Sequence, residues 1–241
     1  MIKIKKPKIV FLVSEDKYYI YDFISRINNF SSVNIKLIVI QKYDESLKRK
    51  IILSFLFGFL NCINLFYKLV FKRSSISIEN FCKENMINYI VTNDLNNSKI
   101  SNEIHNQKAD LIINLNVMKI IKINFLKKFK NTLVNFHPGI LPKYRGLYST
   151  FYKIINKERY FGITAHFMSR KVDDGPIIAI VKKKINGMSL FDCYKIIYEQ
   201  MLFKLFIKTL NNRNNRHIIN NSNLKIYKTP SFLEILKYKI L

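Results

Sequence analysis

Hydrophobic and polar residues alternate between strand-like and helix-like patterns from the start of the chain. Residues 9–13 form a short unbroken apolar run, which is typical of a buried strand. Helical apolar spacing follows in residues 18–27, and residues 33–40 are rich in β-branched side chains, as in a second strand. This order of strand, helix and strand predicts a parallel pair joined by a right-handed crossover.

The same alternation continues through the rest of the chain. Further strands are expected at residues 89–91, 110–113, 132–136, 162–168 and 176–184, and further helices at residues 99–107 and 190–210. Ser189 and Asp192 have the spacing of a capping box at the start of the last helix. The pattern therefore predicts an α/β fold with a mostly parallel central sheet.

Residues 51–71 are the most apolar stretch, and their 21 residues match the length of a membrane span. Polar positions interrupt the stretch along one stripe of a helix: Ser54, Gly58, Asn61 and Lys68. That stripe favours a helix packed on the sheet. Basic residues on both sides also suit a helix that touches a membrane surface or a partner, and a true span is the third alternative. We expect no stable membrane insertion.

The chain is strongly basic, with 41 Lys and Arg against 16 Asp and Glu and a formal net charge of +25 over 241 residues. Such an excess suggests nucleic acid or an anionic membrane as a partner. The densest runs, residues 48–50 and 182–184, hold only three cations each, and the others are spread along the chain. We therefore interpret most of the charge as a solvated surface bias and expect no nucleic-acid partner, with a polyanion-facing patch as the alternative.

Cysteine usage bounds the compartment and the metal chemistry. The three cysteines, Cys62, Cys82 and Cys193, are far apart and form no CxxC pair. This argues against a disulfide framework and against a cysteine-built zinc site, and it favours the cytoplasm. We expect no metal.

Two segments stand apart from this background, the run NFHPGILPKYRG at positions 135–146 and the run DDGP at positions 173–176. Asn135 and His137 lie two residues apart at the end of a predicted strand, so their side chains project to the same face. Open α/β sheets bind ligands at this carboxyl edge. An amide, an imidazole and a carboxylate can together perform acyl transfer. Alternatively, Asn135 and His137 cap the strand and Asp173 begins a turn.

The run at 135–146 resembles the signature of the formyltransferases that use 10-formyltetrahydrofolate, Asn-x-His-Pro-x-x-Leu-Pro-x-Tyr-x-Gly. In that family a catalytic Asp follows in a later Asp-x-Gly turn, which falls here on Asp173. The resemblance covers roughly residues 110–184 well and the rest in outline. It implies a Rossmann-like catalytic domain at 1–184, followed at 185–241 by a C-terminal helix and tail. In the family branch that acts on sugars this segment, including a β-hairpin, builds a homodimer.

The resemblance also implies roles for individual residues. Asn135 and a protonated His137 would stabilise the oxyanion of the tetrahedral intermediate, while Asp173 would tune His137 and help to pass the proton. The co-substrate would be N10-formyltetrahydrofolate. It would rest against two loops, which contain Leu115, Asn116, Val117 and Met118 in the first and Val172 and Asp174 in the second.

Aromatic and basic residues at the end of the motif and just after it are predicted to border the acceptor substrate. They are Tyr144, Arg145, Tyr148 and Tyr152, and the alternative for the aromatic ones is ordinary core packing. His166 shares a strand face with Thr164, as in some family members, and it is assigned to the substrate side with a structural histidine as the alternative.

Three branches of the family differ in the amine that is formylated. The enzymes for glycinamide ribonucleotide carry a glycine-rich phosphate loop after the first strand, where this chain has Ser14-Glu15-Asp16-Lys17. The enzymes for methionyl-tRNA carry a C-terminal barrel, for which we expect too few residues after Gly187. The third branch formylates nucleotide-linked amino sugars for lipopolysaccharide O-antigen.

The chain resembles that third branch in having Gly139 after His-Pro and in the aromatic continuation at 144–152. The implied substrate is dTDP-4-amino-4,6-dideoxyglucose, although the 4-amino position over the 3-amino position rests on overall resemblance alone. The alternative to an enzyme is a basic membrane- or nucleic-acid-binding module that keeps the motif as a relic.

Overall fold

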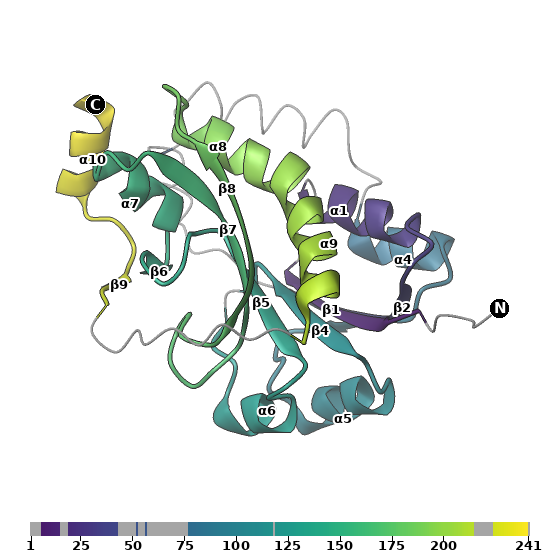
Figure 1. Cartoon of the computed structure of the whole chain (residues 1–241). Helices are drawn as coiled ribbons and strands as arrows, with labels where there is room; N and C mark the ends of the chain where they lie inside the picture. Colours follow the sequence, from purple (N-terminus) through teal and green to yellow (C-terminus); the bar gives the residue numbers. More distant parts are fainter. Residues whose placement is uncertain are drawn as a thin grey trace. The chain divides into compact units, whose positions relative to one another are not determined.

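The computed structural model describes residues 6–14, 19–42, 52, 56, 77–117, 119–214 and 224–240 (Figure 1). The chain divides into two compact units. The first unit comprises Met1–Tyr43, Ser75–Phe136 and Phe167–Arg170, and the second comprises Asp44–Ser74, His137–His166 and Lys171–Leu241. This division does not coincide with the domain boundary expected between residues 184 and 185. That boundary stays a prediction.

Five parallel strands form the sheet of the first unit, in the order β3-β2-β1-β4-β5. Their bounds are β1 (Lys8–Ser14), β2 (Asn34–Gln41), β3 (Tyr89–Thr92), β4 (Leu111–Leu115) and β5 (Leu133–His137). Each lies within about one residue or two of an apolar run in the sequence, because such runs supply the side chains that a buried parallel strand needs. The predicted α/β fold with a mostly parallel sheet is confirmed.

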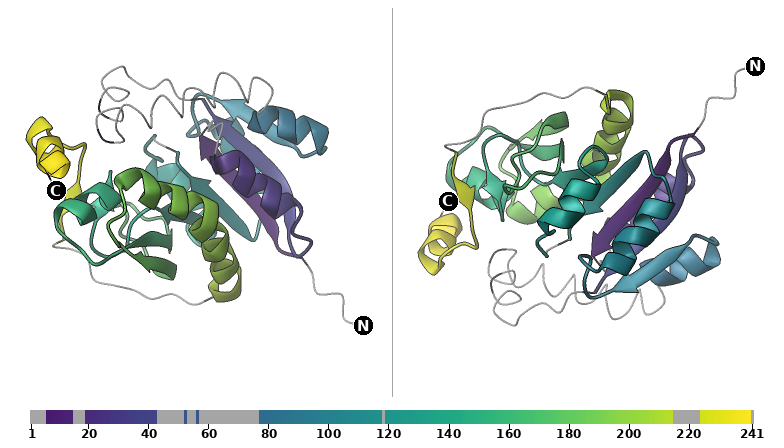
Figure 2. Two further views of the ribbon diagram at one scale, coloured as in Figure 1. Left: turned by 90° about the horizontal axis from the view of Figure 1, so that it is seen from above. Right: turned by 90° about the horizontal axis from the view of Figure 1, so that it is seen from below.

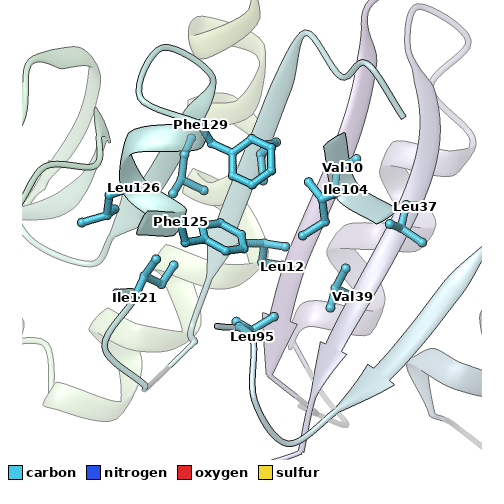
Figure 3. Close-up of a cluster of buried hydrophobic side chains, with 12 residues drawn as sticks. Val10, Leu12, Leu37, Val39, Leu95, Ile104, Ile121, Phe125, Leu126 and Phe129 are labelled. Carbon is cyan, nitrogen blue, oxygen red and sulfur yellow. The ribbon is translucent and has the colours of Figure 1, made fainter. Parts of the chain in front are cut away.

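Helices cover both faces of this sheet, and the alternation of side chains along β1 decides what each face packs against. They are α1 (Tyr19–Asn28), α4 (Ile78–Glu84), α5 (Ser98–Asn106) and α6 (Ile123–Lys128). Val10 and Leu12 belong to a buried cluster with Phe125 and other residues of α5 and α6 (Figure 3). Phe11 contacts Phe23 of α1 edge-on, with ring centroids 6.0 Å apart. The two views of Figure 2 show α1 over one face and α5 and α6 over the other.

The second unit contains an antiparallel pair, a long helical run and the C-terminal residues. Its strands are β6 (Arg145–Gly146), β7 (Tyr160–Phe167), β8 (Ile177–Lys184) and β9 (Ile226–Tyr227). Its helices are α7 (Ser149–Ile155), α8 (Leu190–Ile196), the π-helix η1 (Ile197–Met201), α9 (Leu202–Asn212) and α10 (Phe232–Ile240). β7 and β8 pair in antiparallel fashion, and β6 and β9 pair in parallel.

Several expectations are confirmed and others differ. The helix expected at 190–210 is the run of α8, η1 and α9, and Ser189 and Asp192 do form its capping box. In the described part of the C-terminal segment, β9 pairs with β6, far upstream, and so does not build the expected hairpin there. The helix expected at 51–71 lies outside the described residues, apart from Ile52 and Leu56. Among the helices in the described ranges, none is both long and apolar enough to cross a membrane.

Candidate active site

His137 ends β5 and is almost fully buried, with 3% of its surface exposed. Its Nδ1 lies 3.3 Å from Asp173 Oδ2, and its Nε2 lies 2.9 Å from the carbonyl oxygen of Tyr144. Both neighbours are hydrogen-bond acceptors, whereas a neutral imidazole carries only one N–H. A neutral His137 ring can therefore donate to only one of these two acceptors. If the ring takes up a second proton, it can donate to both.

Asp173 lies in the loop between β7 and β8, in a left-handed backbone conformation with a φ of 47°. Several groups lie against its carboxylate. Besides His137, the Gly146 N–H donates to Oδ2 at 2.8 Å, and His166 Nε2 lies 3.4 Å from Oδ1. The structure thus brings together two of the three predicted catalytic residues and adds His166, which was expected on the substrate side.

Burial and charge act in opposite directions on this pair. Burial lowers the pKa of His137 from its usual 6.5, and the Asp173 carboxylate, which raises it, offsets this only in part. Burial alone would raise the pKa of Asp173, but the His137 imidazole, His166 and the Gly146 N–H together hold it below its usual value. At rest, His137 is therefore expected to be neutral near pH 7, unlike the protonated imidazole implied by the resemblance.

The lowered pKa of His137 also links folding to pH. The unfolded imidazole binds a proton at a higher pH than the buried one does. His137 therefore makes the folded state less favourable as pH falls below 6.5. The lowered pKa of Asp173 acts in the same direction at more acid pH, because its contribution to stability is lost as the carboxylate is protonated.

Gly139 provides the space that the His137 ring occupies. A Cβ at this position would lie 2.5 Å from His137 Nε2 and 2.7 Å from Ser149 Oγ. The loop is held from the other side by Thr164, whose hydroxyl donates to the Gly139 carbonyl at 2.6 Å and accepts from the Leu141 N–H at 3.2 Å. A larger residue at 139 would displace the imidazole or the loop.

Arg145 contacts the residues on both sides of Asp173, the backbone of Val172 and the side chain of Asp174. Arg145 is 2% exposed. Its Nε and Nη2 both donate to the Val172 carbonyl, at 2.9 and 2.7 Å, and its Nη1 lies 3.1 Å from Asp174 Oδ1. The structure therefore joins a residue predicted to bind substrate to two residues predicted to bind folate. These contacts are internal to the protein, because a buried guanidinium needs partners.

Tyr144 and Tyr152 are buried, with contacts typical of packing residues. The Tyr144 hydroxyl donates to Glu158 at 2.8 Å, and the Tyr152 hydroxyl donates to the Lys228 carbonyl at 3.1 Å. Burial raises the pKa of both phenols to about 12. Tyr144 and Tyr152 belong to one buried hydrophobic cluster, and Tyr148 packs against this cluster and is half-buried. A place on the substrate side stays a prediction for all three.

The remaining predicted residues belong to the first unit. Asn135 Oδ1 accepts a 2.8 Å hydrogen bond from Asn114 Nδ2, its partner in the register of β4 and β5. Leu115 is buried at the end of β4, Asn116 has a φ of 56°, and Val117 packs on the buried cluster. Met118 lies outside the described residues. The folate contacts predicted for this loop stay predictions.

Sequence reasoning did not anticipate that the Gly146 N–H would donate to Asp173, or that β6 and β9 would pair. A two-residue strand such as β6 or β9 has no periodicity to detect, and a backbone N–H leaves no trace in residue type. In the described ranges, no group of three or more His, Cys, Asp or Glu side chains is placed to hold a metal ion.

Comparison with known proteins supplies the family. The sequence pattern of the formyl transferase family matches residues 67–191, just over half of the chain. The chain is 31% identical over 115 residues to the phosphoribosylglycinamide formyltransferase of Haemophilus influenzae, which covers 47% of this chain and 52% of that protein. It is 26% identical over 136 residues to the methionyl-tRNA formyltransferase of Finegoldia magna, which covers 56% of this chain and 42% of that protein.

The fold is also similar to a solved structure, glycinamide ribonucleotide transformylase 1 from Symbiobacterium toebii. The TM-score is 0.62 with 14% identity, over 89% of this chain and 94% of the other. The chain spans about half the length of the curated relatives it matches, or less. On the family match over more than half of its residues, the chain belongs to the formyl transferase family.

Proposed function

We propose that this chain transfers a formyl group from N10-formyltetrahydrofolate to the amino group of a nucleotide-linked amino sugar. The observation that carries the proposal is the buried pair of His137, at the end of β5, and Asp173. Both ring nitrogens of His137 face hydrogen-bond acceptors, so the ring has a place for a second proton. The family to which the chain belongs supports formyl transfer as the reaction class.

The pair can move the proton that this reaction must move. The acceptor nitrogen attacks the formyl carbon, and the new C–N bond forms as the carbonyl oxygen becomes an oxyanion. His137 takes the proton of the attacking nitrogen and returns it to N10 of the folate as the bond from N10 to the formyl carbon breaks. Asp173 stabilises the imidazolium between these steps.

The nitrogen of His137 that takes up the reacting proton would be Nε2, because Nδ1 faces the Asp173 carboxylate. Nε2 would then turn from the Tyr144 carbonyl to the substrate amine. Asn135 precedes His137 by two residues in β5, and we propose that its amide donates to the oxyanion. Such a donor is typically worth about 3 kcal/mol of transition-state stabilisation.

The proposed acceptor is dTDP-4-amino-4,6-dideoxyglucose, for O-antigen synthesis by a cytoplasmic homodimer. Its support is in the sequence. Glu15 and Asp16 follow the first strand, where two carboxylates would repel the phosphate of glycinamide ribonucleotide. Gly139 and the aromatic residues at 144–152 resemble the sugar branch. The names of the two relatives above supply the competing acceptors, glycinamide ribonucleotide and methionyl-tRNA.

A panel of acceptors tests the proposal directly. The protein is mixed with N10-formyltetrahydrofolate and, separately, with 3-amino and 4-amino dTDP-sugars, glycinamide ribonucleotide or methionyl-tRNA. We expect tetrahydrofolate release, and an acceptor heavier by one formyl group, with the 4-amino sugar. Formylation of either competing acceptor instead would overturn the substrate, and formylation of none would overturn the activity. His137→Gln serves as the inactive control, and His105→Gln, on the exposed face of α5, as the matched active one.

The pH dependence of kcat/KM should report on His137. We expect an acid limb with its midpoint below 6.5, because burial lowers the pKa of the imidazole that must be neutral to accept a proton. Asp173→Asn should move the limb to still lower pH, since the carboxylate raises that pKa, and should also lower the plateau. Glu103→Gln, at an exposed position of α5, should change neither. A limb that moves to higher pH in Asp173→Asn would contradict this assignment.

A further inference from the structure

Segment 144–146, which contacts the loop that contains Asp173, is itself contacted by C-terminal residues 224–240, hereafter the tail. β6 pairs in parallel with β9, with Arg145 opposite Ile226 and Gly146 opposite Tyr227. The next residue, Leu147, donates its N–H to the Tyr227 carbonyl at 2.9 Å. Backbone pairing therefore joins the tail to the residues that contact the Asp173 loop.

The side chain of Tyr227 adds to this pairing. Its ring stacks on Tyr144, with centroids 5.2 Å apart and planes at 10°, and also contacts Tyr152 at 4.4 Å. The tail is anchored beyond this point as well. The Tyr152 hydroxyl donates to the Lys228 carbonyl, and Ile235 of α10 is buried in the same cluster.

The opposite edge of the same segment faces the catalytic pair. The Gly146 N–H donates to Asp173 Oδ2, Arg145 binds the backbone at Val172, and the Tyr144 carbonyl lies 2.9 Å from His137 Nε2. Both contacts that orient the His137 ring, one to Asp173 and one to Tyr144, thus depend on segment 144–146.

Glycine at 146 permits this close approach. Its φ is 90°, and a Cβ there would collide with the Tyr227 carbonyl. The backbone of Gly146 therefore contacts both the tail and the Asp173 carboxylate. A displacement of the tail would move the Gly146 N–H, and with it the hydrogen bond to Asp173, directly through the backbone.

We propose that Tyr227 is a positioning residue, and that the docked tail holds segment 144–146 where it orients Asp173 and His137. This inference rests on the proposed function for its catalytic consequence. Its structural part, the dependence of the His137 environment on the tail, stands without it.

The kinetic test compares four variants of the full chain. Tyr227→Ala removes the stacked ring, Tyr227→Leu fills the space without stacking, and Tyr227→Phe restores the ring. Phe232→Ala is the matched control, because this tail residue is 65% exposed. We expect kcat to fall about tenfold to a hundredfold in the Ala and Leu variants. KM should stay within about twofold, since the displaced groups act on the reacting atoms. The Tyr227→Phe variant and the control should match the wild type.

A second measurement needs no substrate. In protein labelled with ¹⁵N-histidine, each of the four imidazoles reports its tautomer and its titration. Replacing His105, His166 and His217 by glutamine, one at a time, assigns the signals. We expect Tyr227→Ala and Tyr227→Leu to shift the nitrogen signals and the titration of His137 while those of His105 stay in place.

The outcomes separate the two proposals. If Tyr227→Ala and Tyr227→Leu lower Tm but leave the His137 signals and the kcat of the folded protein unchanged, the tail is structural only and the inference is overturned. If the His137 signals move as expected in a protein that formylates none of the acceptors, the positioning role stands and the proposed function fails. If one of the two variants does not fold, the other decides.

Discussion

His137→Ala is expected to lower kcat for formyl transfer by about three orders of magnitude. The substitution removes the group that we propose takes the proton from the attacking nitrogen, and general acid–base catalysis of this kind typically contributes about 10²–10⁴ to the rate. It also leaves the Asp173 carboxylate buried without one of its partners. The measurement is kcat in single-turnover reactions with N10-formyltetrahydrofolate and the accepted amine.

Two controls separate chemistry from folding. His105→Ala, at an exposed position of α5, should retain full activity. His137→Gln keeps most of the side-chain volume and should be as inactive as His137→Ala, because its amide cannot take up a proton near neutral pH. Retention of more than about a tenth of the wild-type kcat by a folded His137→Gln protein would exclude His137 as the proton acceptor.

Phe11→Ala is expected to lower the free energy of unfolding by about 3–5 kcal/mol. The ring is 0% exposed on β1, which pairs with a strand on either side, and it contacts Phe23 across the interface with α1. Its loss removes apolar burial and leaves a cavity that the sheet cannot collapse to fill. Urea denaturation followed by circular dichroism measures the change.

This loss can exceed half of the stability of an ordinary domain, so a milder variant belongs beside it. Phe11→Leu keeps most of the volume and should cost about 1 kcal/mol. Phe232→Ala, at an exposed position of α10, should change the free energy of unfolding by less than about 0.5 kcal/mol. A loss below about 1 kcal/mol in Phe11→Ala would show that the ring does not support the sheet as described.

Much of the fold could be predicted because its main strands are long enough to show a pattern. The apolar run at 9–13 became β1, and the helical spacing at 190–210 became the run of α8, η1 and α9. β6 and β9 could not be found in this way, since two residues carry no period. Their pairing depends on tertiary contacts between distant parts of the chain.

The site was predicted through a motif, and the motif specified residue types better than it specified contacts. It identified His137 and Asp173, which the structure places 3.3 Å apart. It gave no sign that Arg145 would bind the carbonyl of Val172, because a cation predicted to border the substrate suggests a contact to a ligand before one to the protein's own backbone. The lowered pKa of His137 also depends on burial, which composition does not reveal.

The hydrogen bond from Asn114 to Asn135 sets which end of the Asn135 amide faces β4. Because Asn114 Nδ2 donates to Asn135 Oδ1, the oxygen of that amide faces β4 and its nitrogen is turned away from that strand. The oxygen and nitrogen of a primary amide are nearly the same size, so a 180° turn of the group exchanges its acceptor and its donor without changing its shape. A neighbouring residue that only accepts hydrogen bonds would favour the reversed amide. With Asn114 as the donor, the Asn135 amide keeps its own N–H groups for another partner.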